Sequence, residues 1–178
     1  MLNIVRASVF LLPFLCVFMA PQIALSEDCT KLIFKRYCLG GSVATLPDGV
    51  SEAIVEDGSP GTRFTDTDGD RIVDITAVDG RIARISRRQP PGNWLHFTEW
   101  KTKLVRLYGR GEDRSSFPAY AGSRSSKLNA INAGRGSALI FWQQLGWSVS
   151  LRWDHRDYIT LDYELDSSNR LPEDDEGL

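Results

Sequence analysis

The acidic residues between positions 66 and 74 have the spacing most typical of a metal site. Carboxylates occupy relative positions 1, 3, 5 and 9 of this stretch, and position 7 offers its backbone carbonyl. Several oxygen ligands on one short loop suit a calcium ion. The predicted ligands are Asp66, Asp68, Asp70, Ile72 and Asp74. The alternative is a polar turn that leads into a strand beginning at Arg71.

These nine residues resemble the D-x-D-G-D-G-x-x-D calcium loops of FG-GAP-type repeats. The sequence departs from those loops at Arg71, where they have a glycine that permits a sharp turn. The arginine also brings a positive charge toward the proposed ion. The resemblance implies Ca²⁺ as the one candidate cofactor. If the stretch is a polar turn instead, the sequence predicts no cofactor.

A second candidate site consists of basic residues that follow in the chain. They are Arg81, Arg84, Arg87 and Arg88, with Lys101 or Arg106 of a later helix as possible neighbours. Such a group predicts a surface that binds anions, or one that supplies charged contacts at the rim of an interface. The alternative is a solvated strand face, which scattered charges commonly form.

All five tryptophans lie between positions 94 and 153. Trp and Tyr are enriched at protein interfaces, so Trp142 and Trp147 are the candidates for an exposed aromatic surface that binds a partner. The alternative is a core between a helix and a sheet, because a domain of this size needs most of its large apolar side chains for packing.

The histidines show no catalytic pattern. His155 stands beside Asp154 and near Asp157, but the sequence has neither a G-x-S-x-G nucleophile motif nor an H-E-x-x-H zinc motif. A nucleophilic triad needs a Ser or Cys within hydrogen-bond reach of the base. We therefore expect a protein that is not an enzyme. A cell-wall-directed hydrolase that uses His155 or a carboxylate in a cleft is the alternative.

The region from Ser137 to Leu165 is expected to carry the main part of the sheet. Between positions 147 and 153 apolar residues alternate with Ser148, Ser150 and Arg152, and the alternation repeats over 159–165. Period-two alternation places the apolar side chains on one sheet face. The sequence predicts a three-strand meander here. It also predicts a hairpin over residues 71–87, with a type I′ turn at positions 79–80.

A helix is predicted between the hairpin and the meander. Asn93 can cap its start, apolar residues recur at spacings of three and four, and Gly109 follows its expected end near Tyr108. Residues 123–131 have a weaker helical pattern, and residues 31–36 could form a short helix. Residues 42–70 indicate loops, with short extended pieces at 53–55 and 63–65. The predicted fold is α+β, a mostly antiparallel sheet packed on one main helix, in a single domain over residues 27–165.

The N-terminal residues 1–26 have the pattern of a secretory signal peptide. They combine one basic residue, Arg6, with an apolar run that contains Pro13 and small residues before the expected cleavage site. Cleavage leaves 152 residues with 20 basic and 23 acidic side chains, a net charge of −3. That balance gives no attraction to nucleic acid or to an anionic membrane. No membrane span is expected after cleavage.

Cys29 and Cys38 are the cysteines that remain after cleavage. An even pair in an exported chain predicts a disulfide. The bond requires the segment between them to turn back on itself, because a straight helix would hold the two Cα atoms about 13.5 Å apart.

At the C-terminal end of the sequence, residues 166–178 are acidic and show no periodic pattern, and we expect a disordered tail.

The order of the elements resembles small exported α+β domains of the BamE and β-lactamase-inhibitor-protein type. The resemblance rests on the hairpin, the helix that ends in Leu107-Tyr108-Gly109 and the tryptophan-rich meander. It carries over no functional residue. It implies a curved sheet that presents a concave face to a protein partner, without catalysis. The expected function is therefore that of a periplasmic or secreted protein that binds a partner protein or associates with the cell envelope.

Overall fold

The computed structural model describes residues 29–53, 61–68, 71–154 and 157–166. The strands are β1 (Lys31–Ile33), β2 (Tyr37–Leu39), β3 (Ser51–Ala53), β4 (Thr62–Asp68), β5 (Arg71–Val78), β6 (Arg81–Gln89), β7 (Glu112–Asp113), β8 (Ala138–Gln144), β9 (Trp147–Trp153) and β10 (Ile159–Leu165). The helices are α1 (Trp94–Tyr108), α2 (Arg124–Asn132) and a single 3-10 turn, η1 (Val43–Thr45). The predicted signal peptide, and residues 167–178 of the predicted tail, lie outside the described residues.

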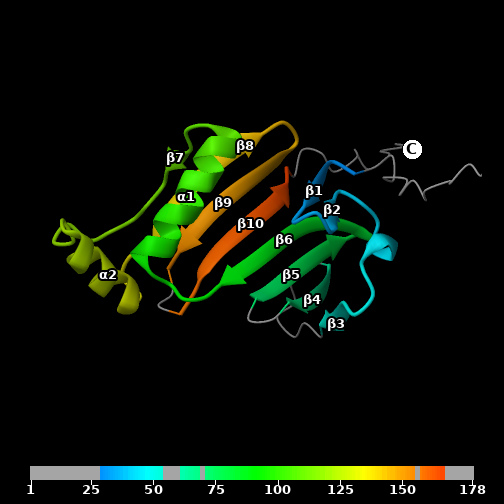
Figure 1. The fold of residues 1–178 in the computed structure, drawn as a ribbon, viewed down its shortest axis with the longest axis horizontal. Coiled ribbons are helices and arrows are strands. Elements are labelled where there is room, and N and C mark those ends of the chain that lie inside the picture. The colour runs from blue at the N-terminus through cyan, green and yellow to red at the C-terminus, as the bar shows by residue number, and fades with distance from the viewer. Residues whose placement is uncertain (1–28, 54–60, 69–70, 155–156, 167–178) are drawn as a thin grey trace, which may run out of the picture.

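Eight strands form one antiparallel sheet in the order β3-β4-β5-β6-β10-β9-β8-β7 (Figure 1). The outermost strands are short, with three residues in β3 and two in β7. Strands β1 and β2 form a separate hairpin. The expected α+β fold is therefore wrong, because the described chain is mostly β. A sheet packed against one main helix is the part of that expectation that fits.

The β1–β2 hairpin replaces the short helix expected over residues 31–36. Its turn places Phe34 and Lys35 in the left-handed region, with φ values of 51° and 60°. Turns of this kind normally use Asn or Gly, because other residues adopt positive φ at a cost. The sequence therefore lacks the usual signal for this hairpin.

Strand β4 lies in the region that the sequence indicated as mostly loops, and the short extended piece expected at 63–65 lies within it. It pairs with β5 over its whole length, from Thr62 opposite Ala77 to Asp68 opposite Arg71. Phe64 is its one apolar residue. Because a strand with so few apolar residues shows no clear alternation, its polar sequence resembles a loop.

The main helix, the hairpin over residues 71–87, the meander and the short second helix are confirmed. Asn93 caps α1 by accepting a hydrogen bond from the backbone of His96 at 2.9 Å. Asp79 and Gly80 form the expected turn with φ values of 52° and 74°. A register shift between Thr76 and Ala77 marks a β-bulge in the β5–β6 pair. The meander of β8, β9 and β10 and the short helix α2 also form where expected.

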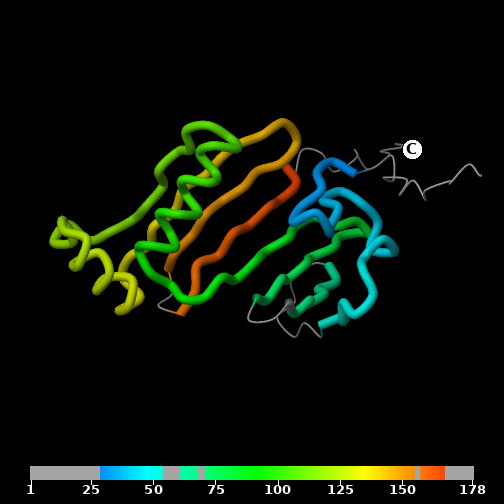
Figure 2. Tube along the Cα trace, viewed as in Figure 1, coloured from blue at the N-terminus to red at the C-terminus, as the bar shows by residue number. Residues whose placement is uncertain are grey.

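Strands β6 and β10 lie side by side although about seventy residues separate them in the chain (Figure 2). Their register pairs Arg88 with Thr160 and Ser86 with Asp162. This pairing joins the early hairpin and the late meander into one continuous sheet. It also decides which polar side chains of the two halves become neighbours.

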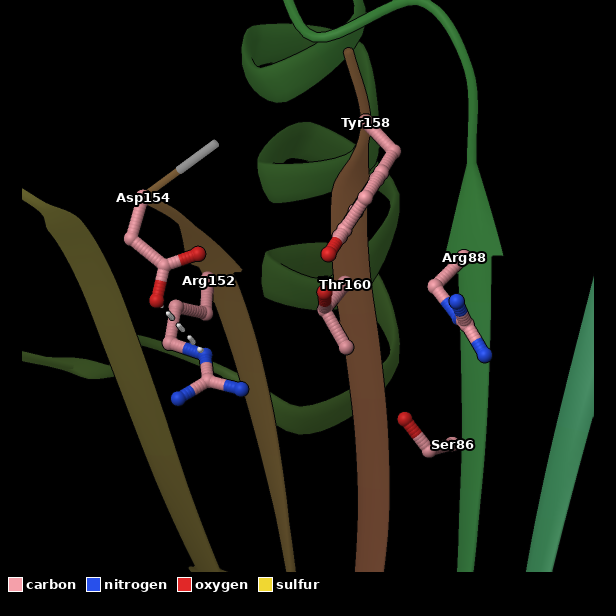
Figure 3. A pocket seen from close by; sticks show the side chains of 6 residues that line it. All are labelled: Ser86, Arg88, Arg152, Asp154, Tyr158 and Thr160. Carbon is pink, nitrogen blue, oxygen red and sulfur yellow. Dashed lines mark ion pairs between the residues drawn. The ribbon is translucent and has the colours of Figure 1, made fainter. Parts of the chain in front are cut away.

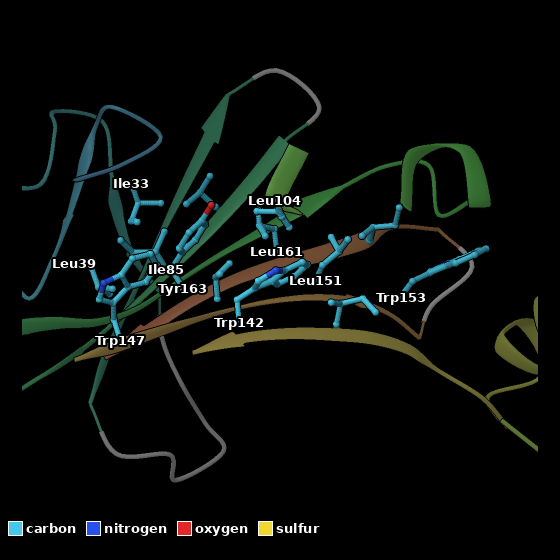
Figure 4. Packing of buried hydrophobic residues seen from close by; sticks show 14 of the residues in the cluster. Ile33, Leu39, Ile85, Leu104, Trp142, Trp147, Leu151, Trp153, Leu161 and Tyr163 are labelled. Carbon is cyan, nitrogen blue, oxygen red and sulfur yellow. The ribbon is translucent and has the colours of Figure 1, made fainter. Parts of the chain in front are cut away.

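Helix α1 and the β1–β2 hairpin pack on the same side of the eight-stranded sheet, which we call the covered face (Figure 1). The opposite side is the open face. The core lies on the covered face and is rich in aromatic rings (Figure 4). Trp153 is fully buried, and its ring makes an edge contact with Trp94 of α1 at 5.0 Å. Within the described residues, neither α-helix is long and apolar enough to cross a membrane.

The predicted disulfide between Cys29 and Cys38 is present and holds the hairpin at its open end. The hairpin packs on the meander through Phe34, whose ring meets Tyr163 edge-on at 5.6 Å, and through Lys31, which lies 5.6 Å from the ring of Trp147. The hairpin therefore covers the core beside the C-terminal end of α1, where the ring of Tyr108 also meets that of Trp147 at 5.6 Å.

Tyr163 makes the stability of this core sensitive to alkaline pH. Burial raises the pKa of its phenol above the ordinary value, the neighbouring Tyr108 adds to the shift, and Arg87 opposes it. Above about pH 10 the unfolded chain loses this proton while the folded chain keeps it, so the free energy of unfolding falls as the pH rises. Melting curves between about pH 9 and 11 should show a shallower pH dependence for Tyr163→Phe than for the parent. Equal slopes would contradict the assignment.

Candidate binding site on the open sheet face

The open face carries polar side chains in rows that run across the strands. One row aligns Arg88 of β6, Thr160 of β10 and Arg152 of β9. The members of the next row are Asp74, Ser86, Asp162 and Ser150. In the part of the chain that the structure describes, no helix packs on these rows, because α1 lies on the covered face. Cross-strand pairing therefore places an ordered set of charges and hydroxyl groups on an accessible surface.

One end of the open face is hollowed into a pocket of about 390 Å³. Its lining residues are Ser86, Arg88, Arg152, Asp154, Tyr158 and Thr160. Figure 3 shows Arg88 and Arg152 on opposite sides of Thr160, with the hydroxyl group of Tyr158 directed toward Thr160. Because adjacent strands lie about 4.8 Å apart, the Cα positions of these two arginines stand about 10 Å apart across β10.

The two arginines of the pocket differ in how they are held. Nε and Nη2 of Arg88 donate hydrogen bonds to one carboxylate oxygen of Asp74, at 3.0 and 2.5 Å, and its guanidinium carbon lies 5.9 Å from the ring of Tyr158. Nε of Arg152 lies 3.4 Å from Oδ2 of Asp154, but it is buried and has no hydrogen-bond partner. Arg88 is therefore fixed in place, whereas Arg152 keeps donor capacity.

Hydroxyl groups form the floor of the pocket. Thr160 is 5% exposed, and Ser86 is half-buried beside it. Among the described residues, the hydroxyl groups of Ser86 and Thr160 make no hydrogen bond. Together with the guanidinium group of Arg152, they leave several hydrogen-bond donors of the pocket unused within the described residues.

An ion pair between a buried carboxylate and a partly exposed arginine lies next to the pocket. Asp162 is 5% exposed and accepts hydrogen bonds from Nη2 and Nε of Arg84, at 2.9 and 3.3 Å. Burial by itself lowers the pKa of Arg84, but the charge and the hydrogen bond of Asp162 outweigh it, so that the pKa is raised. Arg84 thus remains a cation that lies over the central strand of the open face.

The predicted aromatic binding residues lie on the other side of the sheet. Trp142 and Trp147 are 2% and 8% exposed and belong to the core. Nε1 of Trp142 donates a hydrogen bond to the carbonyl oxygen of Gly109 at 2.9 Å. The structure therefore supports the core interpretation of these two rings, because α1 and the hairpin cover the face to which they point.

The predicted arginine group is divided among three places. Arg84 lies on the open face, whereas Arg87 lies on the covered face, where its guanidinium carbon is 4.9 Å from the ring of Phe34. Arg81 stands at the end of the β5–β6 hairpin, and its Nε donates to the carbonyl oxygen of Gly40. The bulge and the alternation of β6 separate them, so they do not form one surface.

The predicted calcium ligands are separated in the same way. Asp66 lies on the covered face, 6% exposed, where it accepts a hydrogen bond from the hydroxyl group of Tyr37 at 2.5 Å and pairs with Arg36 at 3.2 Å. Asp74 lies on the open face and is bound by Arg88. A single ion cannot contact both carboxylates through the sheet. Ile72 stands within β5, and the side chain of Asp68 and all of Asp70 lie outside the described residues.

Among the described residues, no group of three or more His, Cys, Asp or Glu side chains is arranged to hold a metal ion. His155, the candidate base of a hydrolase, lies outside the described residues. Asp154, next to it in the chain, is exposed and pairs with Arg152. Asp157 is also exposed.

Sequence reasoning missed the pocket itself. The alternation in β9 and β10 does place Arg152 and Thr160 away from the core, but nothing local indicates that β6 pairs with β10 and brings Arg88 and Ser86 beside them. Comparison with protein-family models, with curated proteins and with solved structures gave no match to this chain.

Proposed function

We propose that the chain is an exported, non-enzymatic domain that binds a partner protein through the open face of its sheet. The observation that carries the proposal is the open face itself, a broad surface on which charged and hydroxyl side chains stand in ordered rows. Charge pairs at fixed positions can select a partner and fix its orientation. The disulfide is compatible with a periplasmic or extracellular location, and the signal-like residues 1–26 support export.

A protein partner fits this face better than a catalytic reaction does. The face is extended, and its pocket is lined by one carboxylate, Asp154, which already pairs with Arg152. Acid–base chemistry needs a group placed to exchange a proton with the substrate, and the described lining residues include no base paired with a nucleophile. The net charge of −3 after cleavage also argues against a polyanion such as nucleic acid as the partner.

The test compares partner capture by two matched double variants of the mature chain. Ile72→Glu/Glu164→Lys alters two accessible positions of the open face, and Val105→Glu/Glu99→Lys makes the same changes on α1, where Val105 is 40% exposed and Ile72 is 36% exposed. Proteins captured from the envelope fraction should be lost with the first variant and kept with the second. Loss with both variants, or with neither, would refute the open face as the binding surface.

A further inference from the structure

We infer that the pocket between Arg88 and Arg152 is a binding site for a single oxoanion group, carried as a carboxylate, phosphate or sulfate by its ligand. The inference rests on the open face being a ligand-binding surface, as proposed above. It adds the chemical class of the group that this end of the face recognises.

Unpaired donors that line one pocket are the first reason. Within the described residues, the guanidinium group of Arg152 makes no hydrogen bond, its buried Nε included, and neither do the hydroxyl groups of Ser86 and Thr160. All three side chains line the same pocket. Arg88 and Arg152 stand on opposite sides of it (Figure 3). Nε of Arg152 is buried without an acceptor, which is costly, and a ligand that supplies several acceptor oxygens can satisfy it together with the two hydroxyl groups.

The placement of the two guanidinium groups is the second reason. Arg88 and Arg152 occupy equivalent positions on either side of Thr160, whose side chain is short. A planar guanidinium donates two parallel hydrogen bonds to a carboxylate, phosphate or sulfate. Asp74 holds Arg88 in position beforehand through two hydrogen bonds, so that little side-chain entropy remains to be lost on binding.

Asp154 limits the affinity of the site. Its carboxylate is exposed and lies 3.4 Å from Nε of Arg152 without making a hydrogen bond. An entering oxoanion competes with this carboxylate for Arg152 and is also repelled by its charge. Removing the charge of Asp154 should therefore strengthen binding, whereas removing the charge of Arg152 should weaken it.

The experiment is a titration of the folded mature chain with sodium phosphate, sulfate and acetate at constant ionic strength, with chloride as the reference salt. Backbone amide resonances of Ser86, Arg152 and Thr160 are followed by NMR. We expect saturable shifts with at least one of the three anions. Tighter binding of phosphate or sulfate than of acetate assigns a tetrahedral ester group to the ligand, and the opposite order assigns a carboxylate.

Three variants decide whether the pocket is responsible. Arg152→Gln should weaken binding by about tenfold or more, as expected for loss of a charge-assisted pair of hydrogen bonds. Asp154→Asn should tighten it several-fold. Arg110→Gln makes the same charge change at an exposed residue beyond α1 and should leave binding unchanged. Shifts that never saturate, or equal weakening by Arg110→Gln and Arg152→Gln, would overturn the inference. If the anion shifts do not saturate, or both arginine variants weaken binding equally, while Ile72→Glu/Glu164→Lys still abolishes partner capture, the oxoanion site is refuted and the proposed function stands.

Discussion

Replacing Trp153 by alanine is expected to destabilise the protein by about 3–5 kcal/mol, the cost of a large cavity in a packed core. The side chain is fully buried. The centroid of its ring lies 5.0 Å from that of Trp94 and 6.2 Å from that of Phe97. These two partners belong to α1, so that the substitution removes the main aromatic contact between helix and sheet. A loss of this size is a large fraction of the stability of an ordinary domain.

Urea denaturation of the two proteins measures this effect. Leu145→Ala is the control, because Leu145 is 97% exposed at the β8–β9 turn and its replacement should change stability by less than about 0.5 kcal/mol. A Trp153→Ala variant that unfolds at nearly the same urea concentration as the parent would contradict the packing of α1 on this strand.

Replacing Arg84 by alanine is expected to cost about 2–3 kcal/mol, because the carboxylate of Asp162 would remain buried without its cation. The effect should fall below that of a fully buried pair, since the side chain of Arg84 is itself 41% exposed and water can partly replace it. The substitution removes no core contact, because Arg84 lies on the open face.

A double-mutant cycle separates the charge effect from simple truncation. Asp162→Asn in the Arg84→Ala background should recover part of the lost stability, because a neutral amide is less costly to bury than an unpaired carboxylate. Denaturation midpoints of the four proteins provide the measurement. Strictly additive effects of the two substitutions would show that the 2.9 Å contact contributes nothing to folding.

Local sequence signals predicted the elements that carry them strongly. Asn93 and Gly109 mark the two ends of α1, and Asp79 with Gly80 marks the hairpin turn, because each residue type satisfies a specific backbone requirement at its position. The meander was predictable because its strands alternate many large apolar residues with polar ones. Strand β4 has only Phe64 to mark its buried side, so only a short extended piece at 63–65 was predicted there. The β1–β2 turn uses Phe34 and Lys35 instead of a glycine, so the hairpin was not predicted.

The candidate site depends on pairing between strands that are far apart in the sequence, and local sequence patterns do not reveal that pairing. Arg88 and Arg152 line the same pocket only because β10 pairs with β6 on one side and with β9 on the other. The burial of the whole covered face sets this pairing. The same pairing explains why the tryptophans were misleading as interface residues. Their side of the sheet is the side that α1 and the hairpin cover, which leaves the serine and arginine positions facing outward.

The brevity of the two outermost strands protects the sheet margins. Strand β3 has three residues and β7 has two, so that each margin offers few unpaired backbone groups to a neighbouring molecule. If a second copy added a strand there, it would form only a short ladder of backbone hydrogen bonds. The short edge strands should therefore disfavour the addition of another chain to the sheet at β3 and at β7.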